Sequence, residues 1–169
     1  MFTSEDKTAM QAALRAAKRA AKAGETPIGA ALAVGGKVLA VAGNTRERKN
    51  DVAGHAEIAV LRKAAKLRGD WRFPDATLYV TLEPCPMCTG AILAARVGRV
   101  VFGANSASFG AMGSVVDLPS LPLGAHPTVE RGLLSEESSA LLRAFFRRRR
   151  EEEPYTYKEK GDPVCDMTK

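Results

Sequence analysis

Apolar residues along this chain follow two alternating periods, that of a helix and that of a strand. Helical spacing begins after Thr3, and Asp6 lies where it can complete a capping box with Thr3. Shorter apolar runs come next, and the first two are joined by Gly35-Gly36, a strong hairpin signal. The expected elements are helices over 3–23, 55–68, 86–96 and 135–152, and strands over 28–34, 37–43, 77–81, 99–103 and 128–131.

This order of elements predicts an α/β fold. Strands that alternate with helices imply parallel pairing, with helices covering both faces of the sheet, and the opening hairpin adds an antiparallel pair. We therefore expect a three-layer α/β/α arrangement around a central mixed sheet of about five strands. The 169 residues suit one domain, placed at 1–153, followed by a polar tail over 154–169.

Composition and charge restrict the cellular compartment of this domain and the kinds of partner it can bind. No apolar run is long enough for a transmembrane helix, and the first six residues lack the pattern of a signal peptide. Three cysteines do not suggest a disulfide framework, so we expect a reducing compartment, the cytoplasm, and no membrane partner. The formal net charge of +6 permits an anionic partner such as nucleic acid.

The clearest chemical signal is His55-Ala56-Glu57, followed about thirty residues later by Pro84-Cys85-Pro86-Met87-Cys88. One imidazole and two thiolates supply three ligands for a tetrahedral Zn²⁺ and leave its fourth position open for water. Glu57 is then placed to move protons at that water, as zinc deaminases of nucleobases require. The motif therefore predicts both a metal and a reaction.

The local sequence also predicts how these groups meet. Pro86 suits the first turn of a helix that Cys85 would cap, and Cys88 would lie on the same turn. His55 likewise begins a helical segment, so two helix starts should converge on one ion. A redox cysteine pair and a closed structural zinc site are the alternatives. Cys165, far along the chain, is interpreted as a thiol without a role.

The chain resembles the bacterial tRNA-specific adenosine deaminases of the cytidine deaminase-like superfamily over roughly residues 4–150. The resemblance rests on the metal motif and on the following segments: Thr26-Pro27-Ile28-Gly29-Ala30, Asn44, Asp75 to Glu83, Arg96 to Ala104, and Phe145-Phe146-Arg147-Arg148-Arg149-Arg150. It implies the cytidine deaminase-like fold, a homodimer, and conversion of the wobble adenosine to inosine in the anticodon loop of an arginine tRNA.

The same resemblance assigns roles to single residues. His55, Cys85 and Cys88 would bind one Zn²⁺ per subunit, and Glu57 would shuttle protons. Asn44 would hydrogen-bond the purine and its sugar. Further expected substrate contacts are Ile28, Ala56, Leu82, Pro84, Ser106, Phe145, Arg147 and Arg149.

Three loops depart from the family pattern, although none carries a metal ligand. Ser106 stands where the family usually has an aspartate, Val52-Ala53-Gly54 replaces Pro-Thr-Ala, and Ala125-His126 replaces a frequent Asn-His. All lie in loops expected near the nucleic acid. We hypothesise that Ser106 relaxes the preference for RNA over DNA, because an acidic group that repels phosphate is gone.

Other interpretations remain open at this point. The enzyme could act on a free base such as guanine or cytosine, or the chain could be a zinc-stabilised nucleic-acid-binding module without chemistry. The arginines of 147–150 could contact phosphate or pair with Glu151 to Glu153 on the same helix. Phe145 could stack on a base or pack in the core, and Trp71 and Phe73 are interpreted as packing residues.

Overall fold

The computed structural model describes residues 1–152, so the expected tail over 154–169 and Cys165 lie outside the described residues. Its elements are α1 (Ser4–Lys22), β1 (Gly29–Val34), β2 (Lys37–Gly43), α2 (Arg46–Lys49), α3 (Ala56–Arg68), β3 (Ala76–Leu82), α4 (Pro86–Ala94), β4 (Arg99–Ala104), the 3₁₀ turn η1 (Leu118–Ser120), β5 (Thr128–Arg131) and α5 (Ser135–Glu152). Every helix and strand expected from the periodicity is present. No helix within 1–152 is long and apolar enough to cross a membrane.

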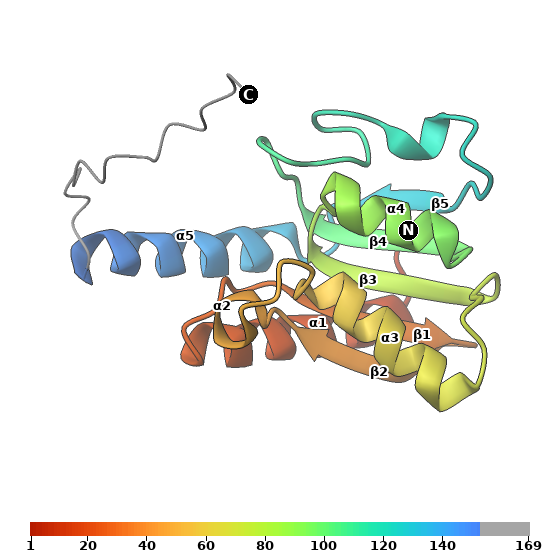
Figure 1. Ribbon diagram of the computed structural model, residues 1–169. Helices are drawn as coiled ribbons and strands as arrows, with labels where there is room; N and C mark the ends of the chain where they lie inside the picture. The colour runs from red at the N-terminus through yellow and green to blue at the C-terminus, as the bar shows by residue number, and fades with distance from the viewer. Residues whose placement is uncertain (153–169) are drawn as a thin grey trace, which may run out of the picture.

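The five strands form one mixed sheet in the order β2-β1-β3-β4-β5 (Figure 1). β1 pairs antiparallel with both β2 and β3, whereas β3, β4 and β5 are parallel. The end of β3, the end of β4, the end of β2 and the start of β1 therefore lie at the same edge of the sheet. The residues that follow or precede these strand ends are the ones expected to form the site.

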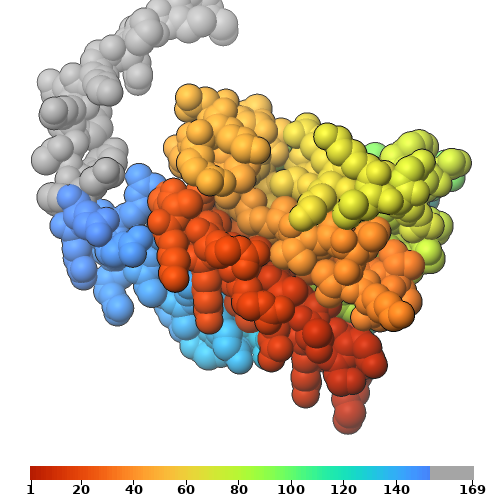
Figure 2. All heavy atoms as spheres, turned by 90° about the horizontal axis from the view of Figure 1, so that it is seen from below, coloured from red at the N-terminus to blue at the C-terminus, as the bar shows by residue number. Residues whose placement is uncertain are grey.

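Alternation along the strands builds two cores, one on each face of the sheet. Leu78 and Val80 of β3 face α3 and α4, where they pack with Leu32, Val100 and Phe102. Tyr79, between them, faces the layer that contains α1. The chain is therefore the three-layer α/β/α structure that the sequence predicts, with α1 and α5 side by side on the second face (Figure 2).

Small residues allow α1 to lie directly on the sheet. Its buried side is mostly alanine, and Gly29 of β1 packs beneath it. A Cβ at Gly29 would lie 2.1 Å from the carbonyl oxygen of Ala13 and 2.6 Å from the amide nitrogen of Ala17. Glycine at this position is thus required by the distance between helix and strand.

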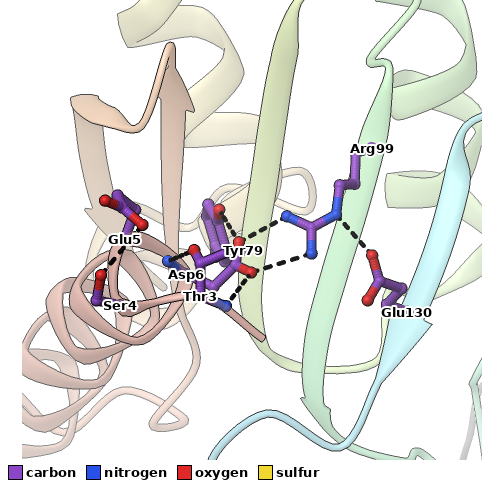
Figure 3. A network of polar contacts seen from close by, with 7 residues as sticks. All are labelled: Thr3, Ser4, Glu5, Asp6, Tyr79, Arg99 and Glu130. Atoms are coloured by element: carbon purple, nitrogen blue, oxygen red, sulfur yellow. Dashed lines mark hydrogen bonds and ion pairs between the residues drawn. The ribbon is translucent and has the colours of Figure 1, made fainter. Parts of the chain in front are cut away.

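A partly buried polar network attaches the start of α1 to the sheet (Figure 3). The predicted capping box is present, since the Asp6 amide donates to Thr3 Oγ1 and the Thr3 amide donates to Asp6 Oδ2. The same carboxylate accepts from Tyr79 and from Arg99, each at 2.6 Å. Arg99 also donates to Glu130 at 2.7 Å, so the network spans α1, β3, β4 and β5.

Two details differ from the sequence-based expectation. The segment expected to be a plain loop before His55 contains the four-residue helix α2. Trp71, interpreted as a packing residue, is 53% exposed, whereas Phe73 is buried as expected. Trp71 lies at the rim of an apolar hollow between α3 and α4, so its ring is part of the exposed surface and does not pack in the core.

Candidate metal and substrate site

His55, Cys85 and Cys88 come together at the edge of the sheet where β3 ends. Their ligand atoms all lie within 4.8 Å of one another. His55 Nδ1 is 3.7 Å from Cys85 Sγ and 3.4 Å from Cys88 Sγ. No fourth histidine, cysteine or acidic residue within 1–152 joins this group, so its geometry is that of a three-ligand metal site with an open position.

The two helix starts converge as the sequence predicts. His55 is the N-cap of α3 and Cys85 is the N-cap of α4, both with extended backbone, and Pro86 occupies the first turn of α4. Cys88 follows one turn later and is buried. The positive ends of both helix dipoles therefore face the thiol groups, which favours thiolate.

Glu57 lies beside this group and is the acidic residue of the His55-Ala56-Glu57 motif. Its side chain is buried, and its Oε2 atom has no hydrogen-bond partner among the described residues. Burial raises the pKa of Glu57, and the neighbouring Cys85 adds to this effect. An unpartnered buried carboxylate oxygen is costly, and Oε2 is therefore available to accept a hydrogen bond from a bound group.

Ionisation of the cysteines also suits metal binding. A hydrogen bond from Cys88 and the contact with His55 together lower the pKa of Cys85 to about 4, against the opposing effect of burial. Cys88 is the donor of this pair, so its own pKa is raised. At neutral pH the group thus holds at least one thiolate, the charged form that soft metal ions bind.

Asn44 lies just past the end of β2, with its backbone amide donating to the carbonyl of Ile28 at 3.0 Å. It is buried, and its Nδ2 donates to Glu25 at 3.3 Å. Asn44 also lines a hollow of about 280 Å³ together with Arg19 and Arg48. The sequence pointed to Asn44 but not to Glu25, because nothing local to Glu25 indicates which segment it contacts.

Ser106 lies in the loop after β4, and Glu83 holds that loop in place. Glu83 Oε2 accepts from the Ser106 amide, and Oε1 accepts from the amides of Met112 and Ser114, each at 3.0 Å. Burial alone would raise the pKa of Glu83, but donors from Ser114, Ser106 and Met112 outweigh it and lower the pKa. Sequence reasoning missed this role, although the position of Glu83 directly before Pro84-Cys85 was a usable signal.

The remaining expected contacts fall into two groups. Ala56 is the first residue of α3, Leu82 is the last of β3, and the Pro84 carbonyl accepts from Ala111 at 2.9 Å, so these three lie in or next to the elements that carry the metal ligands. Arg147 and Phe145, in contrast, line a hollow between α5 and Ala21 of α1.

The side chains of α5 bear on two questions that the sequence left open: whether Phe145 stacks or packs, and whether the arginines of 147–150 are paired. Phe145 is buried within the chain, which fits packing rather than base stacking, while Phe146 is exposed beside it. Arg147 and Arg149 are exposed. Arg148 pairs with Glu152 at 3.5 Å, so part of this arginine run is paired along the helix as the alternative interpretation expected.

Comparison with known proteins agrees with this geometry. The MafB19-like deaminase family matches residues 4–150. The tRNA-specific adenosine deaminase of Bacillus subtilis (strain 168) is 43% identical over 138 residues, covering 81% of this chain and 86% of that protein. The enzyme of the same name from Agrobacterium fabrum is 46% identical over 133 residues, covering 78% of this chain and 88% of that protein.

Two solved structures of deaminases share the fold of this chain to different degrees. One from a study of A-to-I editing by tRNA:A34 deaminases superposes with a TM-score of 0.78 at 45% identity, covering 80% of this chain and 99% of that chain. A guanine deaminase from Bacillus subtilis superposes less well, with a TM-score of 0.58 at 27% identity, covering 91% of this chain and 97% of that chain. The chain therefore belongs to the MafB19-like deaminase family and is a homologue of the bacterial tRNA-specific adenosine deaminases.

Proposed function

We propose that this protein is a zinc-dependent hydrolase that converts the wobble adenosine of a tRNA anticodon loop, that of an arginine tRNA, to inosine with release of ammonia. The observation that carries the chemistry is the buried, unpartnered Glu57 oxygen beside a three-ligand metal group. An adenosine of tRNA as substrate is supported by relatives at 43% and 46% identity that are named tRNA-specific adenosine deaminase, and the wobble position is supported by the solved structure from the study of tRNA:A34 deaminases.

The residues present fit zinc. Two cysteines and one histidine are a donor set that Zn²⁺ binds readily, and the group has no fourth protein ligand within 1–152. His55, Cys85 and Cys88 would hold the ion, which when bound activates water as a nucleophile near neutral pH. This arrangement does not suit a structural zinc site, because such a site is closed by its fourth ligand.

The chain's own residues then carry out the proton transfers. Glu57 would take one proton of the attacking water through its free carboxylate oxygen and pass it to a purine ring nitrogen. It would then take the second proton, from the hydroxyl now on the ring carbon, and deliver it to the departing amine, so that ammonia leaves as the carbonyl forms. Burial of Glu57 suits this role, because a raised pKa brings the carboxyl group closer to the working pH. Asn44 and the backbone of Ala56 and Cys85 hold the base while this occurs.

The surface near the site suits a polyanion. Arg46, Arg48 and Lys49 of α2 are exposed directly after Asn44, and the chain as a whole carries a formal net charge of +6. Exposed cations of this kind gain affinity for a nucleic-acid backbone by releasing its counterions. A free base has no phosphate to use them, so the guanine or cytosine interpretation explains less of this surface.

A substrate panel tests the proposal. Purified protein is incubated separately with an anticodon stem-loop carrying adenosine at the wobble position, with free adenosine, with guanine and with cytosine, and inosine and ammonia are measured. We expect turnover of the stem-loop alone. Turnover of guanine or cytosine without the stem-loop would overturn the substrate assignment, and absence of ammonia from every substrate would overturn the enzymatic one.

We also propose that the protein is a homodimer that uses the apolar hollow between α3 and α4. This hollow, of about 570 Å³, includes Leu61, Phe73 and Ala94 and has the exposed Trp71 at its rim. Exposed apolar surface of this kind marks an interaction site. Ala94→Glu should convert a dimer to a monomer in analytical ultracentrifugation, whereas Val38→Glu on the edge strand β2 should not. A monomer in the unmodified protein would contradict this.

The domain boundary and the compartment complete the proposal. Residues 1–153 would form the deaminase domain, so a chain ending at 153 should retain stem-loop turnover within about twofold. Loss of turnover on this truncation would assign a role to 154–169. The cytoplasm is the proposed location, and fractionation of cells that express the protein checks it.

A further inference from the structure

A buried carboxylate outside the metal group contacts both Asn44 and the basic segment α2. Glu25, in the connection between α1 and β1, is fully buried. Its Oε2 accepts from Asn44 Nδ2 at 3.3 Å and from the Glu47 amide at 3.1 Å, and its Oε1 accepts from the Arg48 amide at 2.8 Å. The Arg48 side chain also lies 3.8 Å from Oε1.

These contacts determine how the Asn44 amide is turned. An ionised carboxylate can only accept hydrogen bonds, so it must face the NH₂ end of the amide. The carbonyl end is then directed away from Glu25. The backbone amide of Asn44 is held independently by the carbonyl of Ile28, so neither the backbone nor the side chain of Asn44 is free to reorient.

The same carboxylate determines where α2 lies. This helix has only four residues, and its N-cap Thr45 makes no side-chain capping bond. A single turn is not stable alone, because helix nucleation is unfavourable. Glu25 supplies the missing acceptor for two amides of that turn, and so fixes Arg46 and Arg48 beside Asn44.

We propose that Glu25 is a positioning residue for substrate recognition, which selects the end of the Asn44 amide that faces the purine nucleotide and joins it to the basic turn α2. This inference rests on the proposed function, because Asn44 is taken as a substrate contact. Glu25 touches no reacting atom, and it acts on the substrate only through Asn44 and α2.

A double-mutant cycle tests the proposal with Glu25→Gln and Asn44→Ala, alone and together, on the anticodon stem-loop. Gln has the shape of Glu but presents an NH₂ group, so Asn44 is free to turn over. We expect Glu25→Gln to lower kcat/KM by about 10–100-fold, the size expected for a hydrogen bond to a charged group. In the Asn44→Ala background the same change should cost much less, because the two act as one unit.

Three controls separate positioning from folding. Metal content should be unchanged in Glu25→Gln, its thermal transition should stay well above the assay temperature, and Glu130→Gln, a carboxylate change in the Arg99 network, should leave kcat/KM unchanged. Additive effects of Glu25→Gln and Asn44→Ala would overturn the proposal. Should Glu25→Gln fail to fold, Glu25→Asp replaces it in the cycle with the same expectation, since its shorter side chain cannot reach both Asn44 and α2.

A spectroscopic measurement distinguishes failure of this inference from failure of the proposed function. The side-chain amide signal of Asn44, assigned in nitrogen-15 spectra by its loss in Asn44→Ala, should shift in the Glu25 variant and not in Glu130→Gln. This result does not require turnover. An unshifted Asn44 signal would overturn the positioning role even if the stem-loop is deaminated, whereas a shifted signal in a protein without stem-loop activity would support the contact and reject the substrate.

Discussion

The Tyr79 hydroxyl donates to Asp6 at 2.6 Å, which joins the middle of the central strand to the first turn of α1. Burial, together with the negative charge of Asp6, raises the pKa of Tyr79 to about 12. The Arg99 guanidinium beside the same carboxylate holds the pKa of Asp6 well below its usual range. The network is thus stable only while Tyr79 is neutral and Asp6 is charged.

Tyr79→Phe should therefore change stability in a pH-dependent way. At pH 8 the variant loses a hydrogen bond to a charged group, which costs about 1.5–3 kcal/mol of stability. An unfolded tyrosine ionises near pH 10, whereas Tyr79 in the folded protein ionises at about 12. The stability that this bond contributes is complete below pH 10 and is lost as pH rises toward 12. Urea unfolding at pH 8 to 11.5 checks this; a constant difference between the two proteins would contradict it.

Gly29→Ala should destabilise the fold, because the added Cβ would meet the Ala13 carbonyl at 2.1 Å and α1 would have to shift. Overpacking of this kind costs about 1–3 kcal/mol. Gly90→Ala in α4 is the matched control, since nothing lies within 4 Å of its Cβ and alanine favours a helix by about 0.5–1 kcal/mol. Thermal unfolding should move in opposite directions for the two variants, and equal shifts would refute the packing argument.

Glu57→Gln should separate metal binding from turnover. The variant keeps the ligands His55, Cys85 and Cys88 but cannot transfer a proton, so turnover should fall by about 10²–10⁴-fold. Metal content by mass spectrometry should stay at one ion per chain. Glu130→Gln in β5, a carboxylate change away from this group, serves as control. Retained turnover in Glu57→Gln would reject the proton-transfer role, and a binding module without chemistry would release no ammonia from either protein.

Ser106→Asp should restore a preference for RNA over DNA. The backbone at 106 is fixed by Glu83, so a new carboxylate there would lie at a defined place beside the nucleotide, where it repels phosphate and can accept from a 2′-hydroxyl. We expect the ratio of RNA to DNA hairpin turnover to rise about tenfold, the effect of one such bond. Ser108→Asp adds the same charge two residues away and should change the ratio less. An unchanged ratio in Ser106→Asp would end the hypothesis.

Local patterns predicted those parts of the structure whose causes are local. The capping box at Thr3 and Asp6 and the Gly35-Gly36 hairpin depend on residues within a few positions, and the metal group is marked by two short motifs, although these lie about thirty residues apart. The helix α2 could not be predicted, because its amides are satisfied by Glu25, 22 residues away. The role of Glu83 likewise depends on contacts across 23 to 31 residues, which only the pairing of β3 with β4 reveals.

Glu25 and Glu83 hold two loops that are structurally separate from the group formed by His55, Cys85 and Cys88. Each buried carboxylate holds one loop, residues 44–48 for Glu25 and 106–114 for Glu83, and neither has a hydrogen bond to His55, Cys85 or Cys88. The ligands themselves are held by the starts of α3 and α4. A substitution within either loop can therefore change substrate selection and leave the geometry of this group unchanged. New substrate preferences can then evolve through single substitutions.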